Sequence, residues 1–448
     1  MKDAAAVSAL TTDQYELTMA ASHFAQGRTA TATFDLFVRR LPPERRFLVM
    51  AGLADALTYL ENLRFTDSDI GFLRSLKQFD DAFLEHLAAL TFTGDVWAIP
   101  EGEIVFPEEP LVRVTAPLIE AQIVETALLT FVGHQTAIAS KAARVALACG
   151  DRQFVDFAAR RTHGPEAALS GARAAYLAGA AATSNVLAGK TFGIPLSGTM
   201  AHSYVMSYDD ERDAFRAFAR DFPTASTLLI DTYDTLQGAR NVVQVAHELA
   251  AEGIRVQGVR LDSGNLAALS HEVRDILDHG GLTDVRIVAS SDLDERRIAD
   301  LLQAGAPIDA FGVGTQMGVA ADAPAMSAVY KLAEYDGRPV QKLSPGKRSL
   351  PGLKQVWRVE RDGVLVGDTI GGADEAGIEG RPMLARAMRS GSVIDGAAHG
   401  TDGLTAARER CAAGLASLPR RLRGFGPSDD PAPVALSPRL AKLGTREG

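Results

Sequence analysis

The feature that most constrains the fold is a strand–helix pattern that repeats through the second half of the chain. Four short apolar runs end at Asp231, Asp262, Ser290 and Gly314, at steps of 31, 28 and 24 residues. The first three runs are each followed by a polar cluster and then by residues with a helical period. This spacing is that of βα units, and continuous Val/Ile/Leu runs are typical of buried parallel strands. The sequence therefore predicts parallel strands whose carboxyl ends carry polar residues.

Three weaker strand candidates precede this block, at 154–160, 181–185 and 194–203. Together the seven predict an α/β fold built on a parallel barrel that is irregular or incomplete, short of eight strands. The flanking sequence differs: β-like runs with Pro/Gly turns occupy 94–116, and antiparallel strands with Asp-Gly turns follow the barrel. We therefore expect a second, smaller domain made from both chain ends.

The expected boundaries follow from these changes of pattern. Residues 136–324 are predicted to form the barrel domain, and residues 1–135 with 325–400 the smaller, discontinuous domain. Residues 401–448 are predicted to be a C-terminal extension, whose last part is rich in Pro and Arg and is expected to be loosely ordered.

The composition excludes several classes of protein. A formal net charge of −10 argues against nucleic acid as the main partner, because phosphate neutralisation needs a basic surface. The two cysteines, Cys149 and Cys411, provide neither a disulfide framework nor a cysteine zinc site. The N-terminus lacks the apolar region of a signal peptide, and no apolar run reaches the roughly 18 residues that cross a membrane. We expect a cytoplasmic protein with no membrane partner.

Two of the predicted strand ends carry charged side chains that need partners. Arg260 and Asp262 are two residues apart on one strand and therefore share a face. Their burial requires either a charged ligand or an internal ion-pair network, and the sequence leaves both open. Asp231 follows its strand directly and is placed to face the same edge, whereas Asp234 fits the N-cap of the next helix.

A histidine and a glycine-rich segment lie at two other strand ends. His202 ends the run 194–203 among small residues, where a reactant could reach it, and His134 and His163 are its competitors. The segment Gly-Val-Gly-Thr at 312–315 allows backbone N–H groups to approach an anion, although a tight turn is the alternative.

An arginine pair completes the candidates. Arg160 and Arg161 would point to opposite faces of a strand, which would bring one into the site; a solvated basic pair is the alternative. The chain has no zincin, P-loop, nucleophile-elbow or dinucleotide-binding motif. The residues alone thus indicate a barrel enzyme that acts on a phosphorylated, metal-chelated small anion, without naming its reaction.

Eleven short segments occur in one order between about residues 8 and 395. Each is weak alone, but the ordered set is specific, and it resembles that of the nicotinate phosphoribosyltransferase family. The segments are LTTDQYELTM (10–19), PEGEIVFPEEPLVRV (100–114), FVDFAARRTHGPEAAL (154–169), ATSN (182–185), GTMAHSYV (198–205), LLIDTYDT (228–235), GVRLDSGNL (258–266), SSDLDE (290–295), FGVGT (311–315), VYKL (329–332) and KRSLPGLKQVWR (347–358).

The resemblance implies a fold and a reaction. The fold is an incomplete barrel with a small α/β domain, in agreement with the pattern above. The reaction joins nicotinate to 5-phosphoribosyl 1-diphosphate, giving nicotinate mononucleotide and diphosphate for NAD salvage, with coupled ATP hydrolysis and Mg²⁺. The magnesium ligands are not identified by the resemblance; we expect the ion to be held mainly through the substrate diphosphate.

The resemblance also implies roles for individual residues. His202 matches the histidine that ATP phosphorylates, Asp231 the carboxylate that supports it, and Asp262 an acid near the ribose. Tyr15 would come from the neighbouring subunit, which implies a homodimer with shared active sites. The implied substrate-binding set is Tyr15 and Phe157 on the pyridine ring, Arg260 on the base, Arg160 on phosphate, Ser184 and Ser203 beside the substrates, and Ser290, Gly312, Gly314 and Thr315 around the 5-phosphate.

Ser184 carries the discrimination between acid and amide substrates. Related nicotinamide enzymes have Asp at this position, and a carboxylate there would accept an amide N–H but repel the nicotinate carboxylate. Ser184 near Arg260 therefore favours nicotinate. The alternatives are a nicotinamide or quinolinate phosphoribosyltransferase and a non-catalytic, nucleotide-binding relative.

Overall fold

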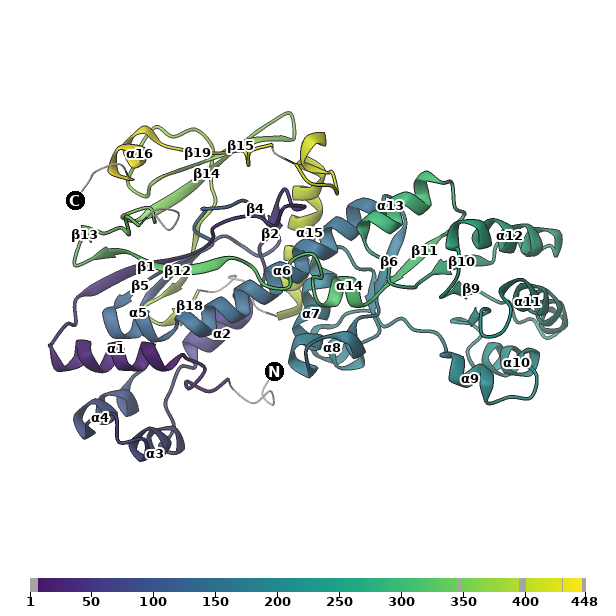
Figure 1. Ribbon diagram of the computed structural model, residues 1–448, viewed down its shortest axis with the longest axis horizontal. Helices are drawn as coiled ribbons and strands as arrows, with labels where there is room; N and C mark the ends of the chain where they lie inside the picture. The colour runs from purple at the N-terminus through teal and green to yellow at the C-terminus, as the bar shows by residue number, and fades with distance from the viewer. Residues whose placement is uncertain (1–6, 345–348, 395–399, 429, 445–448) are drawn as a thin grey trace. The chain divides into compact units, whose positions relative to one another are not determined.

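The computed structural model describes residues 7–344, 349–394, 400–428 and 430–444 (Figure 1). The chain divides into two compact units, described separately below. The chain-end unit comprises Met1–Ser140 and Ala323–Gly448 and is the larger of the two, and the central unit comprises Lys141–Asp322. Helix α6 (Glu125–Cys149) contributes residues to both.

The central unit is built on a parallel sheet of six strands in the order β7-β6-β11-β10-β9-β8. Each strand is short and largely buried, and helices follow the strands along the chain, as the βα pattern predicts. The strands are β6 (Gln153–Asp156), β7 (Ala182–Thr183), β8 (Thr227–Leu229), β9 (Gly258–Leu261), β10 (Arg286–Ala289) and β11 (Ala310–Val313); the helices are η1 (Ala159–Arg161), α7 (Pro165–Leu177), α8 (Val186–Phe192), α9 (His202–Met206), α10 (Glu211–Asp221), α11 (Thr235–Ala250), α12 (Leu266–His279), α13 (Glu295–Gln303) and α14 (Thr315–Gly318).

The sheet forms an incomplete parallel barrel, which confirms the predicted fold class. Two local expectations are wrong. The run 194–203 forms no strand beyond a single parallel bridge between Thr183 and Leu196, and His202 begins helix α9 instead of ending a strand. Arg160 and Arg161 lie on the 3-10 turn η1, because β6 already ends at Asp156, so the two-face argument for a strand does not apply to them.

Side-chain caps fix where the helices of the central unit begin. The carboxylate of Asp234 accepts a hydrogen bond from Gln237 N at 2.7 Å, as expected for the N-cap of α11, and Asp294 caps α13 in the same manner. Such caps satisfy N–H groups that have no partner within the helix. Helices α11 and α12 then lie next to one another, beside strands β9 and β10 (Figure 1).

Two solvent-accessible ion pairs join α10 to α11 and to the turn that directly follows α11. The guanidinium of Arg216 contacts Glu248 at 2.6 Å, and that of Arg220 contacts Glu252 at 2.6 Å, one helical turn further on. Water reaches both pairs, so they contribute little to stability.

The chain-end unit is built on a seven-stranded sheet in the order β13-β12-β1-β5-β3-β17-β18, with every described pairing antiparallel. The turns at Asp336-Gly337 and Asp362-Gly363 both have positive φ at their two residues, which is the geometry that Asp-Gly hairpins favour. The elements are α1 (Gln14–Ala25), β1 (Thr31–Val38), β2 (Leu48–Val49), α2 (Leu53–Glu61), α3 (Asp67–Ser75), α4 (Asp81–Ala89), β3 (Asp95–Ala98), β4 (Ile104–Val105), β5 (Val112–Pro117), α5 (Leu118–Ile123), β12 (Ala328–Tyr335), β13 (Arg338–Pro339), β14 (Lys354–Arg361), β15 (Val364–Gly372), β16 (Arg381–Pro382), β17 (Ala385–Arg389), β18 (Ser392–Val393), α15 (Gly400–Ser417), η2 (Arg420–Leu422), β19 (Val434–Leu436) and α16 (Pro438–Gly444).

The C-terminal residues belong to this unit. Strand β19 pairs in parallel with β15, so that Val434, Ala435 and Leu436 lie opposite Asp368, Thr369 and Ile370. Ser437 then donates a hydrogen bond to Glu375 at 2.8 Å. The expectation of a loosely ordered tail is therefore wrong for this segment, which completes a four-stranded sheet in the order β16-β14-β15-β19.

Within the described parts of the chain, none of the helices combines the length and the apolar character that a membrane span requires.

Candidate functional site

The carboxyl ends of the central strands bring charged side chains together at one edge of the sheet. Asp262 lies at the centre of this group. One of its oxygens accepts a hydrogen bond from Ser290 Oγ at 2.6 Å, and the other lies 3.7 Å from Arg260 Nη2 and 3.7 Å from His202 Nε2. Residues from the ends of β9 and β10 and from the start of α9, far apart in the sequence, thus meet at one carboxylate.

Arg260 is held by the segment that precedes α9. Its Nη1 donates hydrogen bonds to Thr199 Oγ1 and, at 3.2 Å, to the carbonyl of Met200. Its side chain is 12% exposed, and its buried Nε has no hydrogen-bond partner within the described chain. Burial lowers the pKa of Arg260. The negative charges of Asp262 and Asp231 oppose this shift, and the positive charge of Arg160 adds to it. The guanidinium therefore has an N–H available for an anionic ligand.

His202 is the first residue of the short helix α9 and has partners at both ring nitrogens. Its Nδ1 lies 3.1 Å from Thr232 Oγ1, and its Nε2 faces Asp262 as described. The side chain is 40% exposed. A half-exposed imidazole whose two nitrogens are held by a hydroxyl and a carboxylate is oriented and yet open to a reactant.

Asp231 lies beside this group but contacts different atoms. Its Oδ2 accepts hydrogen bonds from Asp262 N at 2.9 Å and Ser263 Oγ at 2.5 Å. The described contacts of His202 are with Thr232 and Asp262, so Asp231 braces the strand end that carries Asp262. Its Oδ1 is buried and has no hydrogen-bond partner in the described chain.

A second group surrounds the ring of Phe157. A Cβ atom added to Gly312 would lie 2.5 Å from the Phe157 ring and 3.3 Å from Ser290 Cβ. Any larger residue at position 312 would therefore clash with this ring. The backbone of Phe157 is fixed by a hydrogen bond from its N–H to Val313 O at 2.9 Å. Gly314 is the N-cap of α14, and a Cβ there would be in ordinary contact, 3.5 Å from Phe157 O.

Asp156 connects the ends of β6 and β7. Its carboxylate accepts hydrogen bonds from Ala158 N at 2.9 Å and Thr183 Oγ1 at 2.7 Å, and its carbonyl accepts one from Ser184 N at 2.9 Å. Burial raises the pKa of Asp156, and the two hydrogen bonds to its carboxylate oppose that shift. Asp156 therefore positions both Phe157 and Ser184 relative to the sheet.

The remaining predicted residues are less closely tied to these groups. Arg160 is exposed on η1, and its charge lowers the pKa of Arg260. Ser203 is exposed on α9, and Thr315 is half-buried at the start of α14. Tyr15 belongs to the chain-end unit, where its side chain is 47% exposed.

The sequence interpretation missed Thr232, Thr199 and Asp156. Two signals were available: Thr232 is adjacent to Asp231 in the same strand-end cluster, and Asp156 is an acid within a buried strand. Thr199 carries no comparable signal, because a threonine in a turn is common.

No group of three or more His, Cys, Asp or Glu side chains with metal-binding geometry occurs among the described residues. The donor set nevertheless fits magnesium that is bound with phosphate, because Mg²⁺ commonly takes one or two carboxylates and completes its shell with phosphate oxygens and water. Asp262 and Asp231, with the unpartnered Oδ1 of the latter, are the residues that could supply those carboxylates.

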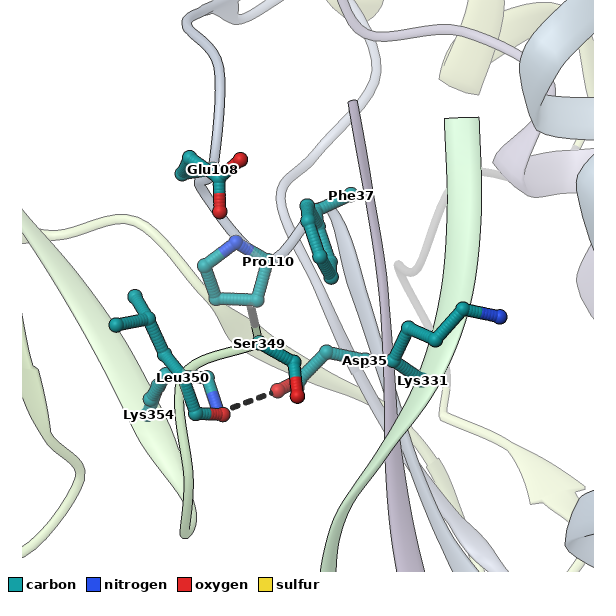
Figure 2. Close-up of a pocket in the computed structure, with 8 residues that line it drawn as sticks. All are labelled: Asp35, Phe37, Glu108, Pro110, Lys331, Ser349, Leu350 and Lys354. Carbon is teal, nitrogen blue, oxygen red and sulfur yellow. Dashed lines mark hydrogen bonds and ion pairs between the residues drawn. The ribbon is translucent and has the colours of Figure 1, made fainter. Parts of the chain in front are cut away.

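Two cavities in the chain-end unit have a different character. The one in Figure 2 has a volume of only about 10 Å³ and surrounds the buried ion pair between Asp35 Oδ2 and Lys354 Nζ, 2.6 Å apart. This space is sufficient for about one water molecule. The other, of about 690 Å³, is an open hollow beside β15 and β19. Neither cavity is lined by His202, Arg260, Asp262 or Ser290. We therefore locate the functional site at the carboxyl-end edge of the central parallel sheet.

Comparison with known proteins is consistent across sequence and structure. The model of the nicotinate phosphoribosyltransferase N-terminal domain matches residues 10–133, and that of the nicotinate phosphoribosyltransferase family matches residues 152–361. A nicotinate phosphoribosyltransferase of Mycobacterium tuberculosis, pncB2, is 50% identical over 434 residues, covering 97% of this chain and 92% of the relative. That of Bacillus subtilis is 47% identical over 358 residues, covering 78% of this chain and 73% of the relative.

The crystal structure of human nicotinic acid phosphoribosyltransferase superposes with a TM-score of 0.85 at 30% identity, covering 97% of this chain and 99% of that one. The ordered segments, the incomplete barrel and these matches lead to the same conclusion: the chain belongs to the nicotinate phosphoribosyltransferase family.

Proposed function

We propose that this protein joins nicotinate to 5-phosphoribosyl 1-diphosphate, releasing diphosphate, and couples this transfer to ATP hydrolysis through phosphorylation of His202. Family membership supports the transferase reaction. The observation that carries the site assignment is the connection of His202, Asp262, Arg260 and Ser290 at the sheet edge.

The transfer breaks the bond between ribose C1 and the diphosphate oxygen and forms a bond from the pyridine nitrogen to C1. The leaving diphosphate takes the bonding electron pair, and the pyridine nitrogen supplies the new one. Positive charge develops on the ribose as the old bond breaks, as in other glycosyl transfers. Asp262 is fixed by the hydrogen bond from Ser290 Oγ to its carboxylate and by the hydrogen bond from its own N–H to the Asp231 carboxylate. Its carboxylate is therefore suited to stabilise that charge.

The base is proposed to bind between Phe157 and Arg260. The Phe157 ring, which packs against Gly312, supplies a flat apolar surface, and the buried guanidinium offers an unpaired N–H to the nicotinate carboxylate. Holding the ring nitrogen against C1 converts a bimolecular reaction into an intramolecular one.

Coupling to ATP requires a nucleophilic nitrogen on His202. An unprotonated ring nitrogen attacks the γ-phosphorus, the bond to the bridging oxygen breaks, and ADP leaves with that electron pair. The other nitrogen keeps its proton, which Thr232 or Asp262 can accept in a hydrogen bond. Water later hydrolyses the phosphoimidazole. Magnesium bound with the diphosphate and ATP would neutralise their phosphate charge.

We further propose a homodimer in which Tyr15 contributes to the partner's site. The Tyr15 side chain is 47% exposed, which supports this role, and its partial burial together with Glu125 raises its pKa.

A substrate panel tests the proposed function directly. We expect the purified protein with 5-phosphoribosyl 1-diphosphate and Mg²⁺ to consume nicotinate in preference to nicotinamide or quinolinate, and ATP to stimulate the reaction. Product formation is measured by chromatography with and without ATP. Preference for nicotinamide or quinolinate would establish one of the two rival transferases, and absence of any product would favour a non-catalytic relative.

Ser184→Asp tests the acid preference. We expect the ratio of kcat/KM for nicotinate to that for nicotinamide to fall by about tenfold or more, because the new carboxylate repels the acid and accepts the amide N–H. Ser207→Asp, which adds the same charge at an exposed position of the central unit, serves as the matched control. An equal ratio in the wild type and in Ser184→Asp would contradict the assignment of Ser184.

A further inference from the structure

The loop between β10 and α13 has an unusual backbone. Ser291 has a φ of 108° and Asp292 a φ of 43°, so two consecutive non-glycine residues adopt positive φ. Such residues are costly and persist only where the surrounding structure fixes them. The loop directly follows Ser290, which binds Asp262 in the candidate site. Its conformation therefore determines where one part of that site lies.

The loop is fixed at both ends. At its start, Ser290 N donates to Leu261 O at 2.8 Å, and Ser290 Oγ to Asp262. At its end, Asp294 caps α13 through Arg296 N and Arg297 N, at 3.1 and 2.9 Å. Arg297 Nη1 also reaches Asp292 O at 3.2 Å. The strongest constraint, however, lies one residue further on, at Glu295.

Glu295 lies in a buried cluster of four charges. Its Oε1 accepts a hydrogen bond from Arg144 Nε at 2.8 Å and lies 2.8 Å from Arg144 Nη2. Its Oε2 lies 2.7 Å from Lys141 Nζ. Lys141 also contacts Asp322 Oδ1 at 3.2 Å. Glu295, Arg144 and Lys141 have side chains no more than 3% exposed. Burial alone would raise the pKa of Glu295, but Lys141 and Arg144 lower it, so the group is ionised.

The cluster is connected to the segments that follow two neighbouring strands. Glu295 begins α13, directly after the β10 loop, and Asp322 lies a few residues after α14, which carries the Gly314 and Thr315 segment. Both partners on α6 are cations, and movement of Glu295 away from them would separate opposite charges that are buried. Displacement of the β10 loop is therefore opposed by the loss of these ion pairs.

We propose that Glu295 is a positioning residue for phosphoribosyl binding: through the Lys141–Arg144 cluster it keeps the strained Ser291–Asp292 turn in place, and with it Ser290 beside Asp262. This inference rests on the proposed function, because it assigns Ser290 to the side of the site that holds the sugar phosphate. Glu295 itself does not touch the substrate.

The test combines removal of the charge with relief of the strain. In Glu295→Gln we expect the KM for 5-phosphoribosyl 1-diphosphate to rise about tenfold, with a smaller change in kcat, because the turn relaxes and Ser290 moves. In the double variant Ser291→Gly/Glu295→Gln we expect KM to return to within about twofold of the wild type, because glycine adopts positive φ without strain. A merely structural role for Glu295 predicts no such rescue.

The matched control is Glu211→Gln. Glu211 is also a buried glutamate at the first position of a helix, α10, and it accepts a hydrogen bond from Asn241 at 2.7 Å in the same unit. The Glu211→Gln substitution should leave the KM for 5-phosphoribosyl 1-diphosphate unchanged. If Glu295→Gln fails to fold, Asp322→Asn replaces it, with an expected rise in KM of about threefold. An unchanged KM in the folded cluster variant, or failure of Ser291→Gly to restore it, would overturn the proposal.

Hydrogen exchange separates this inference from the function on which it rests. The amides of Ser290, Arg296 and Arg297 are hydrogen-bonded in the structure and should exchange faster in Glu295→Gln but not in Glu211→Gln. Absence of transfer by the wild type would refute the proposed function only. Unchanged exchange at these amides would refute the positioning role, whatever the activity.

Discussion

His202→Ala should abolish stimulation by ATP and leave slow formation of nicotinate mononucleotide. The methyl group cannot accept a phosphoryl group, whereas Asp262, Arg260 and Ser290 keep their mutual contacts and can still bind the transferase substrates. We expect the rate at saturating ATP to fall at least about tenfold, to the level measured without ATP. Incubation with Mg-ATP followed by mass spectrometry should detect acid-labile phosphate on the wild type and none on the variant.

His163→Ala is the appropriate control for this experiment. His163 is an exposed histidine of the same unit and one of the two competing candidates, with His134, in the sequence. It should retain both phosphorylation and ATP stimulation. Stimulation by ATP in His202→Ala equal to that of the wild type would refute the phosphohistidine assignment.

Arg260→Leu should reduce kcat/KM for nicotinate by about a hundredfold or more. Leucine removes the proposed partner of the nicotinate carboxylate and leaves Asp262 without its nearest cation. A hundredfold loss corresponds to about 2.7 kcal/mol, which is within the range of about 1.5–3 kcal/mol for a hydrogen bond to a charged group. The loss should appear with nicotinate more than with nicotinamide, because the amide carries no charge to pair.

Two variants identify the cause of that loss. Arg260→Lys keeps the charge but loses Nη1, which donates to both Thr199 and Met200, so we expect an intermediate activity. Arg255→Leu removes an exposed arginine that lies shortly before the same strand and should leave kcat/KM unchanged. Denaturation by urea confirms that each variant is folded. Activity of Arg260→Leu within about twofold of the wild type would exclude Arg260 from the base site.

The strand ends were predictable because buried parallel strands have a distinctive sequence. Continuous apolar runs located β8, β9 and β10, and the residues directly after each run, Asp231, Asp262 and Ser290, lie at one edge as expected. The alternation rule also placed Arg260 and Asp262 on one face, where they form an ion pair. These inferences depend only on local pattern and on the geometry of parallel sheets.

The failures arose where tertiary contacts decide the local structure. The run 194–203 contains Pro195 and Gly198, which weaken a strand, and in the structure it supplies only one bridge before α9 begins. Strand β19 pairs with residues some 65 positions earlier, a pairing that no local pattern announces. The hydrogen bond between Thr232 and His202 likewise depends on two segments that meet only in the folded chain.

The two sets of ion pairs in the central unit should respond differently to ionic strength. The Debye length shrinks from about 10 Å at 0.1 M to about 3 Å at 1 M salt, which weakens attraction between charges that water can reach. The ion pairs of Arg216 with Glu248 and of Arg220 with Glu252 are of that kind, whereas Glu295 and Arg144 are shielded by the protein. Concentrated electrolyte would thus weaken the contacts of α10 with Glu248 and Glu252, while the buried pair of Glu295 and Arg144 persists.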